Sequence, residues 1–118
     1  MGYRSDVALA ITKEDYELLQ EFDKENISLR ELLEIAEIKE TPYVVVLHWN
    51  WIKWYREFPE VQAIDEFMAL ISERGSSYKF VRIGEDMEDT EVDYVCGDKY
   101  NDVVFDAIEV YREINVNI

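Results

Sequence analysis

The stretch Thr41–Phe58, TPYVVVLHWNWIKWYREF, decides the fold expected of this chain. It holds all three tryptophans and the only histidine. Its apolar run Val44–Leu47 is mostly β-branched, which favours a strand covered on both faces. From His48 onward apolar and polar residues alternate, so the stretch predicts a central strand with one face made of Val45, Leu47, Trp49 and Trp51. The other face would carry Val46, His48, Asn50 and Ile52.

The aromatic residues of this stretch allow two interpretations. Trp54, Tyr55 and Phe58 are expected to cover the turn into the next helix, so the tryptophans form a core and its lid. Alternatively they form an exposed platform for a partner, because Trp, Tyr and Arg dominate binding hot spots. His48 is expected to be a strand histidine with a hydrogen-bond partner rather than a ligand or a base.

Length and composition bound the class of protein. The 118 residues suit a single domain, residues 1–118, with one core. The single cysteine, Cys96, excludes an internal disulfide and favours a reducing compartment. No apolar run approaches the roughly 20 residues that span a bilayer, and the N-terminus lacks the pattern of a signal peptide. We therefore expect a cytoplasmic protein.

The formal net charge of -15 is the strongest compositional feature. It argues against direct binding to nucleic acid or anionic membrane, because phosphate binding needs Lys and Arg. It favours the opposite relation, in which an acidic surface meets a basic partner. A surface that is acidic only for solubility has the same composition.

Local signals place the helices. Val7–Thr12 reads as a strand, and Thr12 with Asp15 forms a capping-box pattern before a helix at Lys13–Asp23. Ser28 with Glu31 predicts a second cap and a short helix that ends near Ile38. Pro59 suits the first turn of a third helix that runs to Arg74 before Gly75.

The C-terminal half reads mainly as strands. Ser77–Ile83 and Glu91–Cys96 are predicted strands joined by the acidic turn Gly84–Thr90, and a further turn is expected at Gly97–Asp102. The tail, residues 104–118, fits both a helix and a strand, and its β-branched content favours a strand. The order β-α-α-β-α-β-β-β predicts an α+β fold with a mixed, largely antiparallel five-stranded sheet and helices mainly on one face.

Six acidic residues crowd the predicted turn and the strand after it: Glu85, Asp86, Glu88, Asp89, Glu91 and Asp93. They could hold a hard cation, although the spacing lacks the order of an EF-hand loop. They could also mimic DNA phosphates toward a basic partner. The third interpretation is a solvated hairpin turn.

Signals for chemistry are few. One histidine and one cysteine, far apart in sequence, do not indicate a nucleophile and its base. Gly84 and Gly97 are isolated, so no phosphate cradle is expected, and no zinc spacing is present. The sequence therefore predicts no enzyme, no cofactor and no metal.

Three segments carry a resemblance: Met1–Val7 (MGYRSDV), Trp49–Tyr55 (WNWIKWY) and Tyr78–Asp86 (YKFVRIGED). They resemble small acidic proteins encoded by bacterial phages and prophages. Such proteins are often inhibitors of host defence, including anti-CRISPR proteins. The resemblance implies a role in the bacterial host cytoplasm, with the basic surface of a nucleic-acid-binding protein such as a CRISPR effector as the partner.

Two classes of function follow. In the first, the protein inhibits a host defence nuclease by protein–protein binding through the six acids, Trp54 and Tyr55, with nucleic-acid mimicry as one mode. In the second, it binds a small ligand such as a nucleotide signal in an aromatic pocket near Trp49–Tyr55. The clustered cations available to that pocket are Lys53, Arg56, Lys79 and Arg82.

Overall fold

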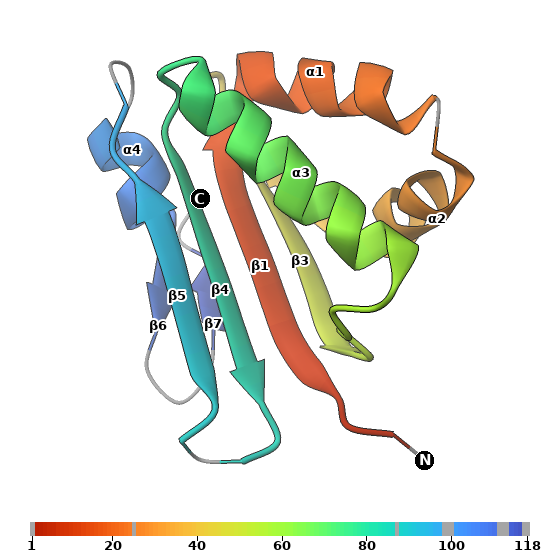
Figure 1. Ribbon diagram of the computed structural model, residues 1–118. Coiled ribbons are helices and arrows are strands. Elements are labelled where there is room, and N and C mark those ends of the chain that lie inside the picture. The colour runs from red at the N-terminus through yellow and green to blue at the C-terminus, as the bar shows by residue number, and fades with distance from the viewer. Residues whose placement is uncertain (1, 25, 87, 98–100, 111–113, 117–118) are drawn as a thin grey trace.

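The fold is built on an antiparallel five-stranded sheet, seen in a computed structural model that describes residues 2–24, 26–86, 88–97, 101–110 and 114–116 (Figure 1). The strands are β1 (Ser5–Thr12), β2 (Glu37–Glu40), β3 (Val44–Ile52), β4 (Tyr78–Gly84) and β5 (Thr90–Val95). Their order in the sheet is β2-β3-β1-β4-β5, and every neighbouring pair is antiparallel. The predicted α+β class with a five-stranded sheet is confirmed.

Helices cover one face of the sheet and a small C-terminal unit covers part of the other. On the first face lie α1 (Lys13–Asp23), α2 (Ile27–Ile35) and α3 (Pro59–Glu73). Behind the sheet lie α4 (Asn101–Asp106) and the hairpin of β6 (Ile108–Val110) and β7 (Ile114–Val116). Because both faces are covered, β1 is apolar throughout its middle, with Leu9 in one core and Ala8 in the other. No helix in the described residues is long and apolar enough to cross a membrane.

The helix starts follow from capping side chains. Thr12 Oγ1 accepts a hydrogen bond from Asp15 N at 3.2 Å, which confirms the first predicted cap. The second cap was predicted at Ser28 and this is wrong, because Asn26 Oδ1 accepts from Leu29 N at 3.0 Å. The helix α2 ends at Ile35, short of the predicted Ile38, because the chain turns there into β2.

Two strand predictions are wrong. The sequence analysis did not predict β2, because its four residues, EIKE, are all exposed at the edge of the sheet and only one of them is apolar. The tail was predicted as the fifth strand, but it forms α4 and a separate hairpin, and β2 supplies the fifth strand. Residues 98–100, 111–113 and 117–118 of the predicted turn and tail lie outside the described residues. The strand at the centre of the sheet is β1, and β3 lies beside it.

A β-bulge near the end of β3 changes which side chains face the core. Between the pairs Val7↔Trp49 and Ser5↔Ile52, β1 advances two residues and β3 advances three. The bulged segment of β3 contains Trp51, whose backbone φ of 61° lies in the left-handed region. The alternation therefore breaks, so that Ile52 packs against the helix-side core and Trp51 is 54% exposed. The prediction that Trp51 lies on the same strand face as Trp49 is wrong.

The other two tryptophans belong to the core between the sheet and the helices. Trp49 is buried, and its indole Nε1 donates to the carbonyl oxygen of Leu32 at 2.8 Å. Trp54 is also buried, and its ring lies 5.3 Å from that of Trp49 and 5.9 Å from that of Phe80. The core-and-lid interpretation thus holds for Trp49 and Trp54, and the exposed interpretation holds for Trp51.

Candidate protein-binding site

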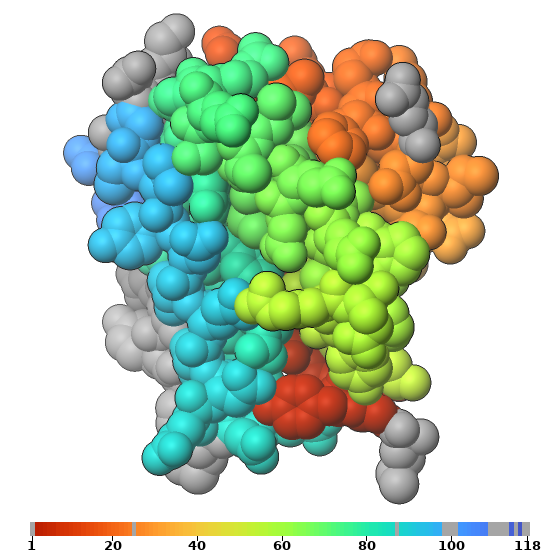
Figure 2. Space-filling view, viewed as in Figure 1, coloured from red at the N-terminus to blue at the C-terminus, as the bar shows by residue number. Residues whose placement is uncertain are grey.

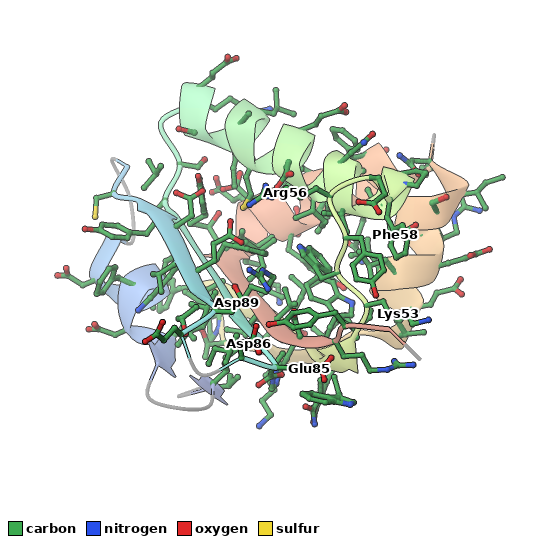
Figure 3. The ribbon with its side chains drawn as sticks, turned by 60° about the horizontal axis from the view of Figure 1, so that its bottom comes forward. Lys53, Arg56, Phe58, Glu85, Asp86 and Asp89 are labelled. Carbon is green, nitrogen blue, oxygen red and sulfur yellow. The ribbon has the colours of Figure 1, made fainter. Side chains whose placement is uncertain are left out.

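The candidate site is the end of the sheet where the N-terminal segment, the end of β3 and the β4–β5 turn meet. We call it the sheet end and define it by Tyr3, Arg4, Trp51, Glu85, Asp86 and Glu88. Hydrogen bonds tie these segments together. Tyr3 Oη accepts from Asp86 N at 3.1 Å, and Arg4 N donates to Glu85 Oε2 at 2.6 Å. Figure 3 shows Glu85, Asp86 and Asp89 gathered at this end.

The exposed tryptophan lies within this same group of residues. Trp51, Arg4 and Glu85 line a shallow hollow together with Gly2 and Tyr3. One guanidinium nitrogen of Arg4 lies 3.4 Å from the carbonyl oxygen of Trp51. A large aromatic side chain and the carboxylate of Glu85 therefore share one surface.

The six predicted acids divide into two groups. Asp89, Glu91 and Asp93 are engaged inside the protein; for example, Tyr78 Oη donates to Asp93 Oδ2 at 2.9 Å. Glu85 accepts the Arg4 hydrogen bond described above. Among the described residues, the carboxylates of Asp86 and Glu88 have no hydrogen bond or ion pair, and both side chains are exposed. Only these two offer unpaired charge at the turn.

Arg82 explains why Asp89 and Glu91 are not free. Its guanidinium makes two hydrogen bonds to Asp89, at 2.7 and 3.1 Å, and a third from Nε to Glu91 at 3.1 Å. Such charge-assisted bidentate pairs are stronger than neutral hydrogen bonds. Tyr3 Oη adds a further donor to Asp89 at 2.5 Å. Asp89, one of the six candidate acids, is therefore paired within the protein. The pairing of Arg82 with Glu91 across the hairpin brings these groups together, and the sequence analysis did not foresee it.

Asp89 makes the stability of the protein depend on acid pH. The hydrogen bonds from Arg82 and then Tyr3 lower the pKa of Asp89 from 3.8 to about 2. A depressed carboxyl pKa stabilises the fold above the unfolded value, and the stabilisation is lost as pH falls through the folded value. We expect Asp89→Asn to be less stable than wild type at neutral pH, with the gap closing between about pH 4 and about pH 2. Urea denaturation of wild type and Asp89→Asn across this range measures the gap.

The two aromatic residues predicted to bind a partner, Trp54 and Tyr55, lie outside the β4–β5 turn. Trp54 is 9% exposed, so most of its side chain packs inside the core. Tyr55 is half-buried and its ring packs 4.9 Å from that of Phe58. Trp51 is an exposed aromatic residue of this region, and alternation in the sequence placed it on the strand face of Trp49.

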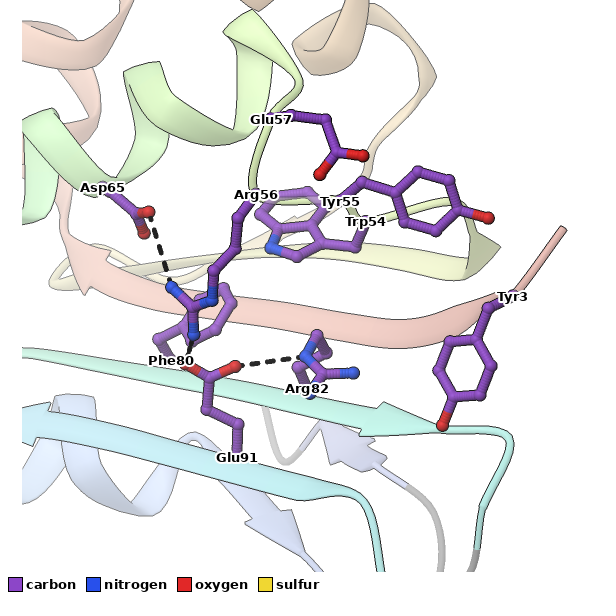
Figure 4. Close-up of a pocket in the computed structure, with 9 residues that line it drawn as sticks. All are labelled: Tyr3, Trp54, Tyr55, Arg56, Glu57, Asp65, Phe80, Arg82 and Glu91. Carbon is purple, nitrogen blue, oxygen red and sulfur yellow. Dashed lines mark hydrogen bonds and ion pairs between the residues drawn. The ribbon is translucent and has the colours of Figure 1, made fainter.

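Trp54 and Tyr55 line a second hollow, on the helix face of the sheet, with a volume of about 490 Å³. We call it the Arg56 hollow, and its principal lining residues are Trp54, Tyr55, Arg56, Asp65, Arg82 and Glu91. Figure 2 shows the surface hollowed between the segment after β3, which reaches across toward β5, and the N-terminal segment. Figure 4 shows the lining side chains, with Arg56 between Asp65 and Glu91.

The four predicted cations do not form one cluster. Arg56 and Arg82 line the Arg56 hollow. Lys79 is buried and donates to the carbonyl oxygens of Phe105 and Ile108, at 3.1 and 2.9 Å, which fastens the C-terminal unit to the sheet.

The histidine of β3 has a hydrogen-bond partner on the neighbouring strand, as the sequence predicts. His48 Nε2 lies 2.7 Å from Asp6 Oδ1 of β1.

A second acidic surface is the outer side of the helical layer. Acidic residues outnumber Lys and Arg in each of α1, α2 and α3, and none of these helices has a basic residue in its last turn. Glu17, Glu34 and Glu66 are exposed members of this surface.

In the described part of the chain, no group of three or more His, Cys, Asp or Glu side chains is arranged to hold a metal ion.

Fold and site together define an α+β domain with an antiparallel sheet and an acidic, tryptophan-bearing sheet end. No protein-family model, no curated protein and no solved structure matches the chain.

Proposed function

We propose that this protein is an acidic interaction protein that binds a basic surface of another protein through its sheet end. The observation that carries the proposal is Trp51, which is 54% exposed and has φ 61°. Trp51 lines one hollow together with Glu85, and Glu85 begins the turn that carries the unpaired carboxylates of Asp86 and Glu88. An exposed tryptophan on a surface that also carries charged side chains has the composition of a binding hot spot with a polar rim.

The backbone of Trp51 supports this interpretation. A left-handed conformation costs a non-glycine residue roughly 1–2 kcal/mol, and an exposed side chain returns little of that cost through burial. Such residues persist where the surroundings impose them, and they cluster at functional sites. The bulge that imposes the conformation also directs the indole away from the core.

The charge of the protein supports a basic partner. At a net charge of -15 the chain is repelled by nucleic acid and attracted to surfaces that bind nucleic acid. The resemblance to phage and prophage proteins makes a host defence nuclease, such as a CRISPR effector, the kind of partner we propose. That step rests on analogy and not on site chemistry.

The small-ligand alternative has a hollow but lacks the charge that a nucleotide needs. In the Arg56 hollow, Glu57, Asp65 and Glu91 outnumber the two arginines. Arg82 is already paired with Asp89 and Glu91. A phosphate would therefore meet surplus negative charge, and we place the interaction function first.

A pull-down from bacterial lysate tests the proposal. Wild-type protein should capture nucleic-acid-binding proteins at about 0.1 M salt, and lose them near 1 M as the Debye length falls from about 10 Å to about 3 Å. The double reversal Asp86→Lys with Glu88→Lys should abolish capture, because it replaces the unpaired carboxylates of the sheet end.

The matched control is Glu17→Lys with Glu34→Lys. It changes the net charge of the protein by the same amount as the first double variant, but on the helical layer. This control should retain most of the capture. Equal loss in both double variants would mean that the total charge, and not the sheet end, determines binding.

A further inference from the structure

Beyond the sheet end, the Arg56 hollow has the lining of a site for a cation. Three carboxylates, those of Glu57, Asp65 and Glu91, line the hollow. The rings of Trp54 and Phe80, which pack against each other, line it as well and form its aromatic floor. Carboxylates pair with a guanidinium through charge-assisted hydrogen bonds, and aromatic faces attract cations within about 6 Å. The volume of about 490 Å³ lies within the usual range of about 300–1,000 Å³ for binding pockets.

The protein already places a guanidinium in this position. Arg56 Nη2 lies 2.9 Å from Glu91 Oε2, and Nη1 lies 3.9 Å from Asp65 Oδ2. The side chain of Arg56 is nevertheless 73% exposed, and exposed ion pairs contribute little to stability. Another guanidinium can therefore replace it at small cost, while Arg56 turns into solvent.

Two polar groups in the hollow are open to a ligand. The Asp65 carboxylate is 46% exposed and lies 3.9 Å from Arg56; partial burial and the charges of Glu91 and Asp93 raise its pKa, and Arg56 lowers it. Trp54 is 9% exposed, and its indole N–H has no hydrogen-bond partner among the described residues, in contrast to that of Trp49. Figure 4 shows the indole nitrogen on the side of the ring toward Arg56. A bound residue with a cationic side chain and a carbonyl oxygen would pair with the Asp65 carboxylate and accept a hydrogen bond from the Trp54 indole N–H.

We infer that the Arg56 hollow takes an arginine side chain from the basic partner. This inference rests on the proposed function, and it names the residue type that the partner would insert. The guanidinium lies between Asp65 and Glu91, over the aromatic floor, and a main-chain carbonyl of the partner accepts from Trp54 Nε1. Tyr3 lines both this hollow and the hollow beside Trp51, so one partner surface can reach both.

The test uses the purified protein and a small probe, N-acetyl-arginine amide, with the indole N–H resonances followed by NMR. Trp54→Phe identifies the Trp54 resonance by its loss. We expect this resonance to move saturably with the arginine probe, and to stay in place with N-acetyl-citrulline amide, which has nearly the same shape without the charge. Asp65→Asn should weaken the apparent affinity by about fivefold, the upper end for an exposed ion pair.

The matched control is Glu66→Gln, which removes the same charge from the next, exposed residue of α3 and should leave probe binding unchanged. The inference is overturned if the arginine probe leaves the Trp54 resonance unmoved, if the citrulline probe moves it equally, or if both variants weaken binding equally. None of these results would affect the proposed function, which depends on Asp86, Glu88 and Trp51.

Discussion

Phe67→Ala is expected to lower the free energy of unfolding by roughly 3–5 kcal/mol, the range for truncation of a buried phenylalanine. Phe67 is fully buried on the inner side of α3, and its ring meets that of Phe22 edge to face at 5.9 Å. It therefore joins α1 and α3 over the sheet, and the cavity left by alanine cannot close without moving a helix. Urea denaturation followed by tryptophan fluorescence measures the loss.

Leu70→Ala on the same helix is the control. Leu70 is 36% exposed, so its truncation should cost less than about 1 kcal/mol. A loss below about 1 kcal/mol for Phe67→Ala would mean that the inner stripe of α3 does not pack against the core as the structure shows.

The sequence predicted those elements whose signals are local. The first helix begins at Thr12 because a hydroxyl oxygen accepts from the backbone, and the third begins at Pro59 because proline suits a first turn. The β-branched runs of β1 and β3 predicted strands covered on both faces. The strand β2 has no such signal, because an exposed edge strand forms through its backbone pairing with β3.

The candidate site was predictable only in part. The acidic turn was visible as a run of charges, but the division between paired and unpaired acids depends on Arg82, whose contacts come from the hairpin register. The exposure of Trp51 depends on one extra residue in the pairing of β3 with β1. Strict alternation predicts the opposite face, because a single inserted residue reverses every side chain beyond it.

Trp51→Gly is expected to weaken partner binding by about thirtyfold or more, since truncation of a hot-spot tryptophan costs about 2 kcal/mol or more. The same change should alter the free energy of unfolding by no more than about 1.5 kcal/mol. Glycine relieves the left-handed strain of roughly 1–2 kcal/mol and loses about 0.5–1 kcal/mol through its greater unfolded-state freedom. Calorimetric titration with the captured partner measures the binding affinity, and urea denaturation measures the free energy of unfolding.

Trp51→Phe is the control for this prediction, because it keeps both an aromatic side chain and the backbone strain. It should bind more tightly than Trp51→Gly and be no more stable than wild type. Binding by Trp51→Gly at the wild-type affinity would remove the tryptophan from the interface.

The most direct test of the central claim is a photo-crosslink from the sheet end inside bacterial cells. Benzoylphenylalanine would replace Trp51 in one variant and Leu70, which is also exposed, in the other. We predict that position 51 crosslinks to a basic, nucleic-acid-handling protein, and that position 70 yields little of this product. Crosslinks to such a protein from position 70, with none from position 51, would contradict the account.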